Sequence, residues 1–377
     1  MNSSVRLQVS IDEQTLRVFD ASGLIRSYPV STAARGMGCR EGSLRTPTGR
    51  LRIARKIGAG QPCGTIFRSR EPVGCWDGEP ASAEDLILTR ILWLEGLDEE
   101  NANTLGRYIY IHGTHREDLL GTPASHGCVR MANQDLLELF ERVEEGTPVE
   151  ILPATRRRGK LLFLDCDSTL STIEGIDELA RARGEEVFQR VVALTDAAMN
   201  GEVAIAEVFP RRMELIRPDR KLCDRIAQRY IECKVEGVEE LLSEVKQRGW
   251  TPVILSGGFA PLIEPLAALL GIQHIEAVPI HFDADGGYAG FGGDFPTTRN
   301  HGKNEVIREW KAALLPECVA MMGDGVSDLE TRTDVDLFIG FGGVVERSKV
   351  KAGAGFWLND MRHREGLWQA LDGLAGR

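Results

Sequence analysis

One change in the spacing of apolar residues constrains the fold of this 377-residue chain more than any other feature. In the first half, apolar and polar side chains alternate, as in Val5–Ile11, which predicts β-strands with one buried face. A polar segment without periodicity follows at residues 153–159, and beyond it short apolar runs alternate with stretches of helical spacing. We therefore expect two domains, residues 1–152 and 160–377, connected by a linker at 153–159.

The two domains are expected to differ in architecture. The first is predicted to be mainly β, with a helix at Asn133–Val143. In the second, strands such as Leu161–Leu164 alternate with helices, which predicts an α/β doubly wound, Rossmann-like core with a parallel sheet covered on both faces. Residues from about 178 to 235 show helical spacing without a strand, so we expect an inserted helical cap there.

Charge and composition limit the partners that this chain is expected to have. The net charge of −11 argues against nucleic acid, because phosphate binding requires a basic face. No apolar run reaches the length of a membrane span, and the first residues lack a cationic segment followed by an apolar stretch. The eight cysteines show no CxxC spacing, so mostly free thiols are expected. These features predict a cytoplasmic protein that binds neither nucleic acid nor membranes.

The first half contains a cysteine in a setting that suits a nucleophile. Residues 125–130 read Ser-His-Gly-Cys-Val-Arg, and an apolar run that is predicted to be a strand ends at His112. A cysteine reacts as its thiolate and needs a proton acceptor, a role that His112 is able to fill. Gly127 allows close approach of the backbone, so that amides near Cys128 are expected to form an oxyanion hole. Arg130 supplies positive charge for a substrate carboxylate or fixes the loop.

Two other interpretations of these residues stay open. A single cysteine is usually buried and inert. The set His112, His115, His126 and Cys128 also offers nitrogen and sulfur ligands of the kind that Zn²⁺ accepts. The pair His112 and His115 ends a strand instead of occupying one face of a helix, which disfavours zinc.

The segment from residue 1 to about 152 resembles the YkuD-type L,D-transpeptidases, whose signature is a strand ending in His-Gly, then Ser/Thr-His-Gly-Cys followed by Arg or Asn. The resemblance implies that Cys128 is the nucleophile and that His112 is the acid/base, oriented by the backbone carbonyl of Gly113. It also implies supporting roles at the substrate for His126, Gly127 and Arg130. Members of this family cleave the L,D bond of a peptidoglycan stem tetrapeptide, release D-alanine and pass the acyl group to an amine or to water.

The expected location bears on which of these reactions takes place. Inside the cell, the available stem peptides are those of recycled muropeptides or precursors, and water is the abundant acceptor. The hypothesis is therefore an L,D-carboxypeptidase that acts on peptidoglycan stem peptides or muropeptides, rather than a cross-linking enzyme.

The second half contains a pair of carboxylates at the end of a predicted strand. Asp165 and Asp167 directly follow Leu161–Leu164, at the edge where open α/β sheets bind ligands. One carboxylate can attack phosphorus while the other donates a proton to the leaving oxygen. Their mutual repulsion requires a cation, and Mg²⁺ suits carboxylate oxygens and phosphate. An EF-hand loop is excluded, because Leu170 and Ile176 stand where that loop needs Gly and Glu.

Residues further along the chain complete such a site. Ser256 and Gly257 follow a predicted strand at Pro252–Leu255, where a hydroxyl and free amides are able to hold phosphate. Lys303 supplies positive charge for the transferring group. Asp324 and Asp328 follow a predicted strand at Val319–Met322 and are expected to hold the metal together with Asp165 and Asp167.

Together these motifs resemble the haloacid-dehalogenase-superfamily phosphatases, and in particular the phosphoserine phosphatases, from about Lys160 to the end of the chain. The resemblance implies an aspartyl-phosphate at Asp165. It implies that Asp167 is the general acid/base and binds Mg²⁺ through its carbonyl, that Ser256 and Lys303 clamp the phosphate, and that Asp324 and Asp328 anchor the metal.

The expected substrate, L-phosphoserine, depends on two further residues. Glu174 matches the family glutamate that meets the substrate ammonium, and Arg212 aligns with the arginine that pairs with the carboxylate. The alternative is that both belong to an ordinary solvated helix face. Ser327 departs from the usual Asn of the family motif, which puts the substrate preference in doubt.

The sequence thus predicts a bifunctional, Mg²⁺-dependent phosphatase and L,D-transpeptidase or L,D-carboxypeptidase. Two alternatives remain: a phosphatase of another small phosphomonoester, and a YkuD domain that serves as a muropeptide-binding module.

Overall fold

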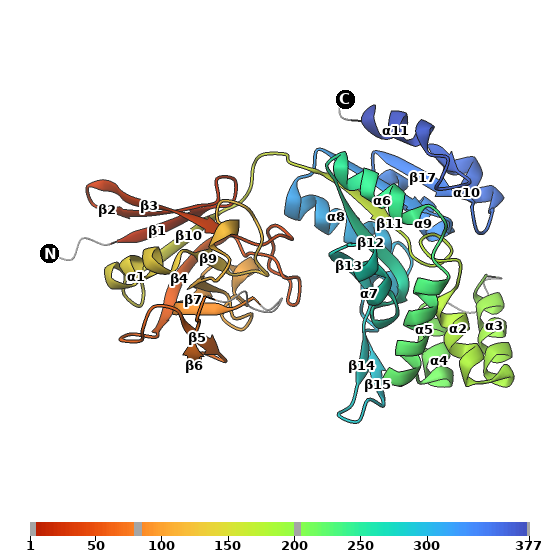
Figure 1. Cartoon of the computed structure of the whole chain (residues 1–377), viewed down its shortest axis with the longest axis horizontal. Coiled ribbons are helices and arrows are strands. Elements are labelled where there is room, and N and C mark those ends of the chain that lie inside the picture. The colour runs from red at the N-terminus through yellow and green to blue at the C-terminus, as the bar shows by residue number, and fades with distance from the viewer. Residues whose placement is uncertain (1–4, 79–84, 200–204, 375–377) are drawn as a thin grey trace. The chain divides into compact units, whose positions relative to one another are not determined.

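The computed structural model describes residues 5–78, 85–199 and 205–374. The chain divides into two compact units, one built mainly from residues 1–157 and the other mainly from residues 158–377 (Figure 1). Each unit has its own hydrophobic core. Among the described residues, none of the helices combines the length and the apolar character needed to cross a membrane.

The first unit is built on one ten-stranded sheet with the order β4-β10-β1-β2-β3-β9-β8-β7-β5-β6. Because β4 also pairs with β7, the strands from β4 to β7 in this order close into a ring, and β5 and β6 extend from it. The strands are β1 (Arg6–Ser10), β2 (Thr15–Asp20), β3 (Gly23–Ser31), β4 (Gly49–Ile57), β5 (Thr65–Arg68), β6 (Glu71–Cys75), β7 (Ile87–Gly96), β8 (Tyr110–Gly113), β9 (Val129–Met131) and β10 (Pro148–Leu152).

The core of the first unit joins one face of these strands to a helix. Helix α1 (Asn133–Arg142) lies almost where the helical spacing predicts it, and it buries Leu136, Leu139 and Phe140. These side chains pack against inward-facing strand residues such as Ile111 and Val129. Successive residues of a strand point to opposite faces, so the neighbours of Ile111 in β8 face away from this core.

The second unit contains a six-stranded sheet with the order β13-β12-β11-β16-β17-β18, in which every neighbouring pair is parallel. Its strands are β11 (Lys160–Leu164), β12 (Trp250–Phe259), β13 (His274–Val278), β16 (Cys318–Gly323), β17 (Leu337–Phe341) and β18 (Phe356–Leu358). The helices that alternate with these strands are α6 (Val238–Gln247), α7 (Ala260–Leu269), α8 (Gly302–Leu314), α9 (Val326–Glu330) and α10 (Ser348–Gly353), and α11 (Glu365–Asp372) follows the last strand. This is the alternation that the apolar pattern predicts.

Register explains where the candidate site of this unit lies. Leu164, the last residue of β11, is paired with Ile254 in β12 and with Met322 in β16. The segments that follow these three positions therefore meet at the carboxyl edge of the sheet, where a parallel sheet places its ligands.

Two smaller elements lie beside this edge. Helices α2 (Gly175–Arg183), α3 (Glu185–Met199), α4 (Ile205–Ile216) and α5 (Arg220–Glu232) form a bundle, and β14 (Ile280–Phe282) pairs with β15 (Tyr288–Phe291) in a hairpin (Figure 1). The hairpin is absent from the expectations drawn from the sequence. Phe209 of α4 packs against Phe291 of β15 and Phe259 of β12, so that aromatic side chains join the bundle to the hairpin and the sheet.

Candidate active sites

The face of β8 that points away from the core carries the candidate thiol site. In the parallel pairing of β8 with β9, Ile111 is opposite Val129 and His112 is opposite Arg130. Cys128 immediately precedes β9 and packs with Tyr110 of β8 in a small apolar cluster. His112 and Cys128 thus belong to the same sheet face. The strand predicted ahead of His112 starts later than expected and continues through Gly113, because Tyr108 adopts a positive φ of 56° that interrupts extended backbone.

The contacts of the thiol and the imidazole are made with the backbone. Cys128 Sγ accepts a hydrogen bond from the Tyr110 amide at 3.4 Å and donates one to the Tyr108 carbonyl at 3.6 Å. His112 Nδ1 lies 2.8 Å from the Gly113 carbonyl oxygen. Burial raises the pKa of Cys128 to about 11, and burial lowers the pKa of the fully enclosed His112. The resting pair is therefore a neutral thiol and a neutral imidazole.

This protonation state predicts how Cys128 reacts with an alkylating agent. Since a thiolate forms only as the pH approaches the raised pKa, iodoacetamide labelling of Cys128 should accelerate roughly tenfold per pH unit between pH 7 and 10. Mass spectrometry of the peptide that contains Cys128 measures the rate, and the exposed Cys63 serves as an internal reference. A labelling rate that levels off below pH 8 would instead show a thiolate–imidazolium pair.

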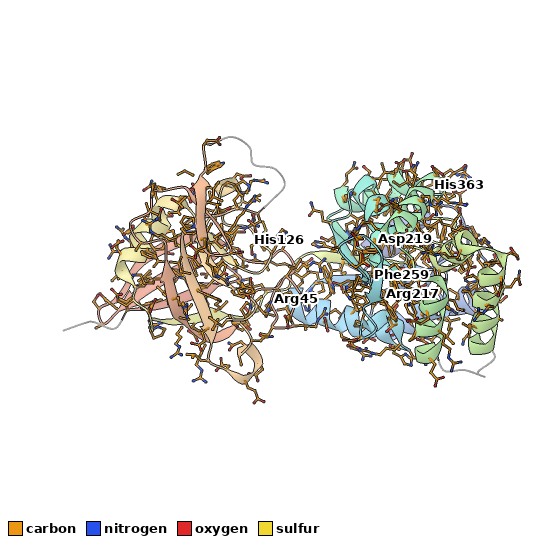
Figure 2. All side chains as sticks on the ribbon, turned by 90° about the horizontal axis from the view of Figure 1, so that it is seen from below. Arg45, His126, Arg217, Asp219, Phe259 and His363 are labelled. Carbon is orange, nitrogen blue, oxygen red and sulfur yellow. The ribbon has the colours of Figure 1, made fainter. Side chains whose placement is uncertain are left out.

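The carboxylate of Asp85, which the sequence analysis did not identify, interacts with two basic residues of this site. Asp85 forms an ion pair with the buried Arg130, and its Oδ2 atom lies 3.7 Å from His126 Nδ1. The His126 side chain, which is labelled in Figure 2, is 63% exposed. Arg130 is therefore already neutralised, and a substrate carboxylate would compete with Asp85 for it. Asp85 stands outside any motif, and no signal in the sequence identifies it.

The backbone at Gly127 has the conformation that the expected oxyanion hole needs, but the Gly127 amide already donates a hydrogen bond. Gly127 has a φ of +127°, which favours glycine, and its carbonyl oxygen accepts a hydrogen bond from the Thr46 hydroxyl at 3.0 Å. Its amide donates to Ser125 Oγ at 3.2 Å, so this donor is engaged within the loop. Among the described residues, the histidines and Cys128 do not gather into a metal-binding cluster, and the zinc interpretation receives no support.

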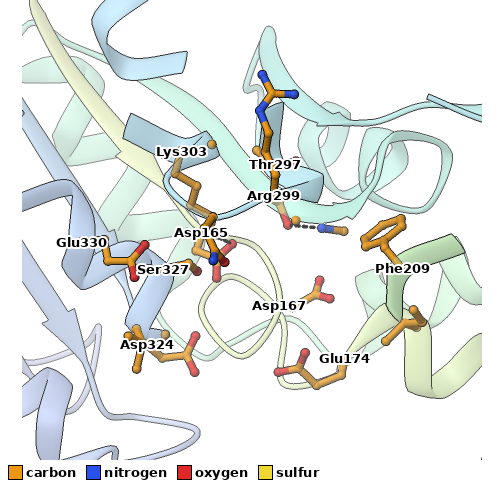
Figure 3. A pocket seen from close by; sticks show the side chains of 18 of the residues that line it. Asp165, Asp167, Glu174, Phe209, Thr297, Arg299, Lys303, Asp324, Ser327 and Glu330 are labelled. Carbon is orange, nitrogen blue, oxygen red and sulfur yellow. Dashed lines mark hydrogen bonds and ion pairs between the residues drawn. The ribbon is translucent and has the colours of Figure 1, made fainter. Parts of the chain in front are cut away.

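The second candidate site is a pocket of about 430 Å³ in the second unit. Figure 3 shows Asp165, Lys303 and Asp324 on one side of it and Glu174 and Phe209 on the other. The sequence-predicted residues that line it are Asp165, Asp167, Glu174, Arg212, Ser256, Gly257, Lys303 and Asp324.

An acidic cluster and one lysine form the polar end of the pocket. Carboxylate oxygens of Asp165, Asp324 and Asp328 all lie within 4.8 Å of one another. Lys303 Nζ is 2.9 Å from Asp165 and also contacts Asp328. Burial and the nearby charge of Asp165 raise the pKa of Asp328 to about 7 and that of Asp324 to about 6. Burial lowers the pKa of Lys303, but the two carboxylates outweigh this effect and its pKa is raised.

This cluster fits a small divalent cation. Three converging carboxylates are the ligands that Mg²⁺ prefers, and positive charge between them would relieve the repulsion that raises their pKa values. The Oδ2 atom of Asp324 is buried without a hydrogen-bond partner among the described residues, although the Arg347 guanidinium lies 3.1 Å away. Lys303 alone therefore does not satisfy every carboxylate oxygen of the cluster, and oxygen atoms remain that are able to bind a cation.

The carboxylate of Asp167 is not part of this cluster, and the metal contact predicted for this residue is that of its backbone carbonyl. Its Oδ1 accepts a hydrogen bond from the Tyr230 hydroxyl at 2.6 Å, and its Oδ2 accepts one from the Gly175 amide at 3.0 Å. These donors hold the side chain at the start of α2. Burial, followed by the charge of Glu174, raises the pKa of Asp167 to about 8, so that it carries a proton at neutral pH.

The remaining predicted residues surround the same pocket. Ser256 is buried at the end of β12, and its Oγ accepts a hydrogen bond from the Gly258 amide at 2.9 Å. Glu174 Oε1 accepts a hydrogen bond from the Ser168 hydroxyl at 2.7 Å, and burial raises the pKa of Glu174. Arg212 reaches the pocket from α4. Glu174 and Arg212 therefore do not belong to an ordinary solvated helix face. Sequence reasoning missed Tyr230 and Arg347, which lie far from the motifs.

Comparison with known proteins places both units in families. The model of the L,D-transpeptidase catalytic domain, YkuD, matches residues 4–151, and the model of haloacid dehalogenase-like hydrolases matches residues 162–331. Phosphoserine phosphatase from Mus musculus is 36% identical over 198 residues, which cover 52% of this chain and 87% of that protein. The chloroplastic phosphoserine phosphatase from Arabidopsis thaliana is 35% identical over 213 residues, which cover 55% and 71% respectively.

Among solved structures, a phosphoserine phosphohydrolase-like protein from Francisella tularensis subsp. tularensis SCHU S4 is similar at 22% identity. The match covers 55% of this chain and 99% of that one, with a TM-score of 0.49. By the extent of its match to the curated phosphatases, the chain belongs to the phosphoserine phosphatase family of haloacid dehalogenase-like hydrolases, and it carries a YkuD L,D-transpeptidase catalytic domain ahead of the hydrolase domain.

Proposed function

We propose that the second unit is a Mg²⁺-dependent phosphatase that hydrolyses L-phosphoserine through an aspartyl-phosphate. The observation that carries this proposal is a single pocket that joins an acidic cluster and a buried lysine to a carboxylate and a guanidinium at its other end. The phosphate of the substrate would bind at Lys303 and Ser256, and the amino-acid part would lie between Glu174 and Arg212.

The residues of the pocket suit a two-step phosphoryl transfer. In the first step an Asp165 oxygen bonds to phosphorus while the P–O bond to the serine side chain breaks, and Asp167 gives its proton to the leaving oxygen. In the second step Asp167 takes a proton from water, the resulting hydroxide attacks the phosphorus, and Asp165 is released with inorganic phosphate. Lys303 stabilises the charge that develops on the phosphoryl oxygens.

A bound Mg²⁺ would be held by Asp165, Asp324 and Asp328, with the Asp167 carbonyl as a further ligand, and would neutralise the charge of the phosphate and the carboxylates. The bundle α2–α5 acts in this proposal as a cap that supplies Arg212 and limits the entry of water. Exclusion of water strengthens every electrostatic contact inside the pocket.

Truncated substrates test the role of the two charged residues. The kcat/KM for phosphate release should be about 10- to 100-fold higher with L-phosphoserine than with O-phosphoethanolamine, which lacks the carboxylate. This factor corresponds to the free energy of about one charge-assisted hydrogen bond. The Arg212→Gln variant should lose this preference, because the group that distinguishes the two substrates is gone. The measurement is phosphate release with Mg²⁺ across both substrates and across sugar and nucleotide phosphates.

Arg211 provides the matched control for this experiment. It neighbours Arg212 in α4 but forms an exposed ion pair with Glu207, and Arg211→Gln should keep the preference. Equal rates for all phosphomonoesters in the unaltered protein would remove L-phosphoserine as the substrate and favour the alternative, a phosphatase of another small phosphomonoester.

A second activity is proposed for the first unit. Cys128 and His112 on one sheet face, together with the YkuD match, support an L,D-transpeptidase or L,D-carboxypeptidase that acts on peptidoglycan stem peptides or muropeptides. The Cys128 sulfur bonds to the scissile carbonyl carbon after His112 takes its proton, and D-alanine leaves with that proton. An amine or water then cleaves the thioester. In the alternative, this unit binds muropeptides without turning them over.

A further inference from the structure

A row of side chains leads across the sheet from Cys128 to a pair of arginines. In the pairing of β4, β7 and β8, Arg55 is opposite Trp93, and Trp93 is opposite Tyr110. Tyr110 and Trp93 pack in one cluster with Cys128. An irregularity in β4 between Ile53 and Arg55 is what brings Arg55 to this face, because Ile53 points into the core.

The far part of this row is a pocket of about 400 Å³. The residues that line it are Arg55, Arg70, Trp93, Leu105, Gly106 and Tyr108. The Arg70 guanidinium lies 4.9 Å from the ring centre of Trp93 and 5.0 Å from that of Tyr108, so it is stacked at the aromatic wall. Arg55 is exposed, and Tyr108 is 53% exposed.

Among the residues that the structure describes, Arg55 and Arg70 form no ion pair with a carboxylate, whereas Arg52 in the same strand pairs with Glu95. Two guanidinium groups without counter-charges beside aromatic rings form a site for an anion with an apolar or planar portion. The carbonyl of Tyr108 in the wall of this pocket is also the acceptor for the Cys128 thiol, so the pocket adjoins the nucleophile.

We propose that this aromatic–arginine pocket binds a carboxylate of the acyl-donor peptide, on the side that remains attached to Cys128 after the leaving group departs. The proposal rests on the peptidase function proposed above. Neighbouring strands are about 4.8 Å apart, so the two strand steps from Cys128 to Trp93, where Arg70 is stacked, span roughly 10 Å. After D-alanine departs, the acyl part has three residues, which cover about 10 Å when extended, so it reaches from the thiol to this pocket.

The test uses two synthetic stem tetrapeptides with glutamate as the second residue, and they differ only in whether the α-carboxylate of this glutamate is free or amidated. Both are titrated calorimetrically into the full-length protein with the Cys128→Ala substitution, which prevents turnover. The free carboxylate should lower Kd at least about tenfold relative to the amide, as a charge-assisted pair does. Arg55→Gln and Arg70→Gln should each remove most of this difference while the Kd of the amidated peptide stays within about twofold.

Arg26→Gln is the matched control, because it removes one positive charge from an arginine that pairs with Glu138 of α1 instead. This variant should keep the preference for the free carboxylate. Equal binding of the two peptides, binding of neither, or an unchanged preference in the Arg55→Gln and Arg70→Gln variants would overturn the proposal. Release of D-alanine by the protein with Cys128 intact is measured separately, so failure of the peptidase function is distinguished from failure of this subsite.

Discussion

Replacing Asp165 by asparagine is expected to lower the rate of phosphate release by roughly 10⁴-fold, because an amide cannot act as the nucleophile in the first transfer step. The substitution is nearly isosteric and removes one negative charge from a crowded acidic cluster, so the fold should persist. Lys303 keeps its contact with Asp328 in this variant. Steady-state phosphate release from L-phosphoserine with Mg²⁺ measures the effect.

The same variant should leave the release of D-alanine from a stem tetrapeptide unchanged, since Asp165 belongs to the second unit. Asp372→Asn is a suitable control, because this aspartate forms a surface ion pair with Arg248 and lines no part of the pocket. Phosphatase activity of Asp165→Asn within tenfold of the unaltered protein would show that another group carries the phosphoryl intermediate.

Replacing Cys128 by alanine should have an effect of similar size on the other activity. Release of D-alanine from a stem tetrapeptide is expected to fall by at least about 10³-fold, because no other group replaces the sulfur in the thioester intermediate. Mass spectrometry of the products measures this loss. Phosphate release should stay within about twofold, as expected for sites in separate units.

The exposed Cys63 gives the control for the loss of a thiol in the same unit, and Cys63→Ala should keep the peptidase activity. If the unaltered protein binds the tetrapeptide but Cys128→Ala changes neither binding nor products, the first unit is a muropeptide-binding module and not an enzyme.

The residues that could be predicted from the sequence are those whose positions are set by local backbone. Asp165 follows a buried strand that the apolar pattern predicts, so the fold places it at the carboxyl end of the parallel sheet as soon as the strands pair. The predicted helix at 133–143 also follows from local spacing, and α1 differs from it by one residue. Periodicity therefore carries most of the architecture and the position of Asp165, whereas Cys128, which precedes the unpredicted strand β9, is identified by its motif.

The supporting residues were not predictable, because long-range packing positions them. Asp85 meets Arg130 across 45 positions of the chain, and Tyr230 meets Asp167 across 63. A tyrosine in an amphipathic helix such as α5 is normally assigned to the core, and its hydroxyl contact becomes visible only in three dimensions. Arg55 is a similar case. Strict alternation puts it on the face of Ile53, and only the irregularity in β4 reverses this assignment.

The alternation within β8 directs neighbouring side chains of one strand into two different surroundings. Ile111 packs in the core of the first unit, while its immediate neighbours Tyr110 and His112 face the candidate thiol site on the reverse side of the same four-residue strand. Both outward side chains are nevertheless buried, so a substitution at Tyr110 or His112 would also disturb packing. A YkuD domain built in this way is expected to change its ligand preference more readily at exposed pocket residues such as Arg55 and Tyr108 than within this strand.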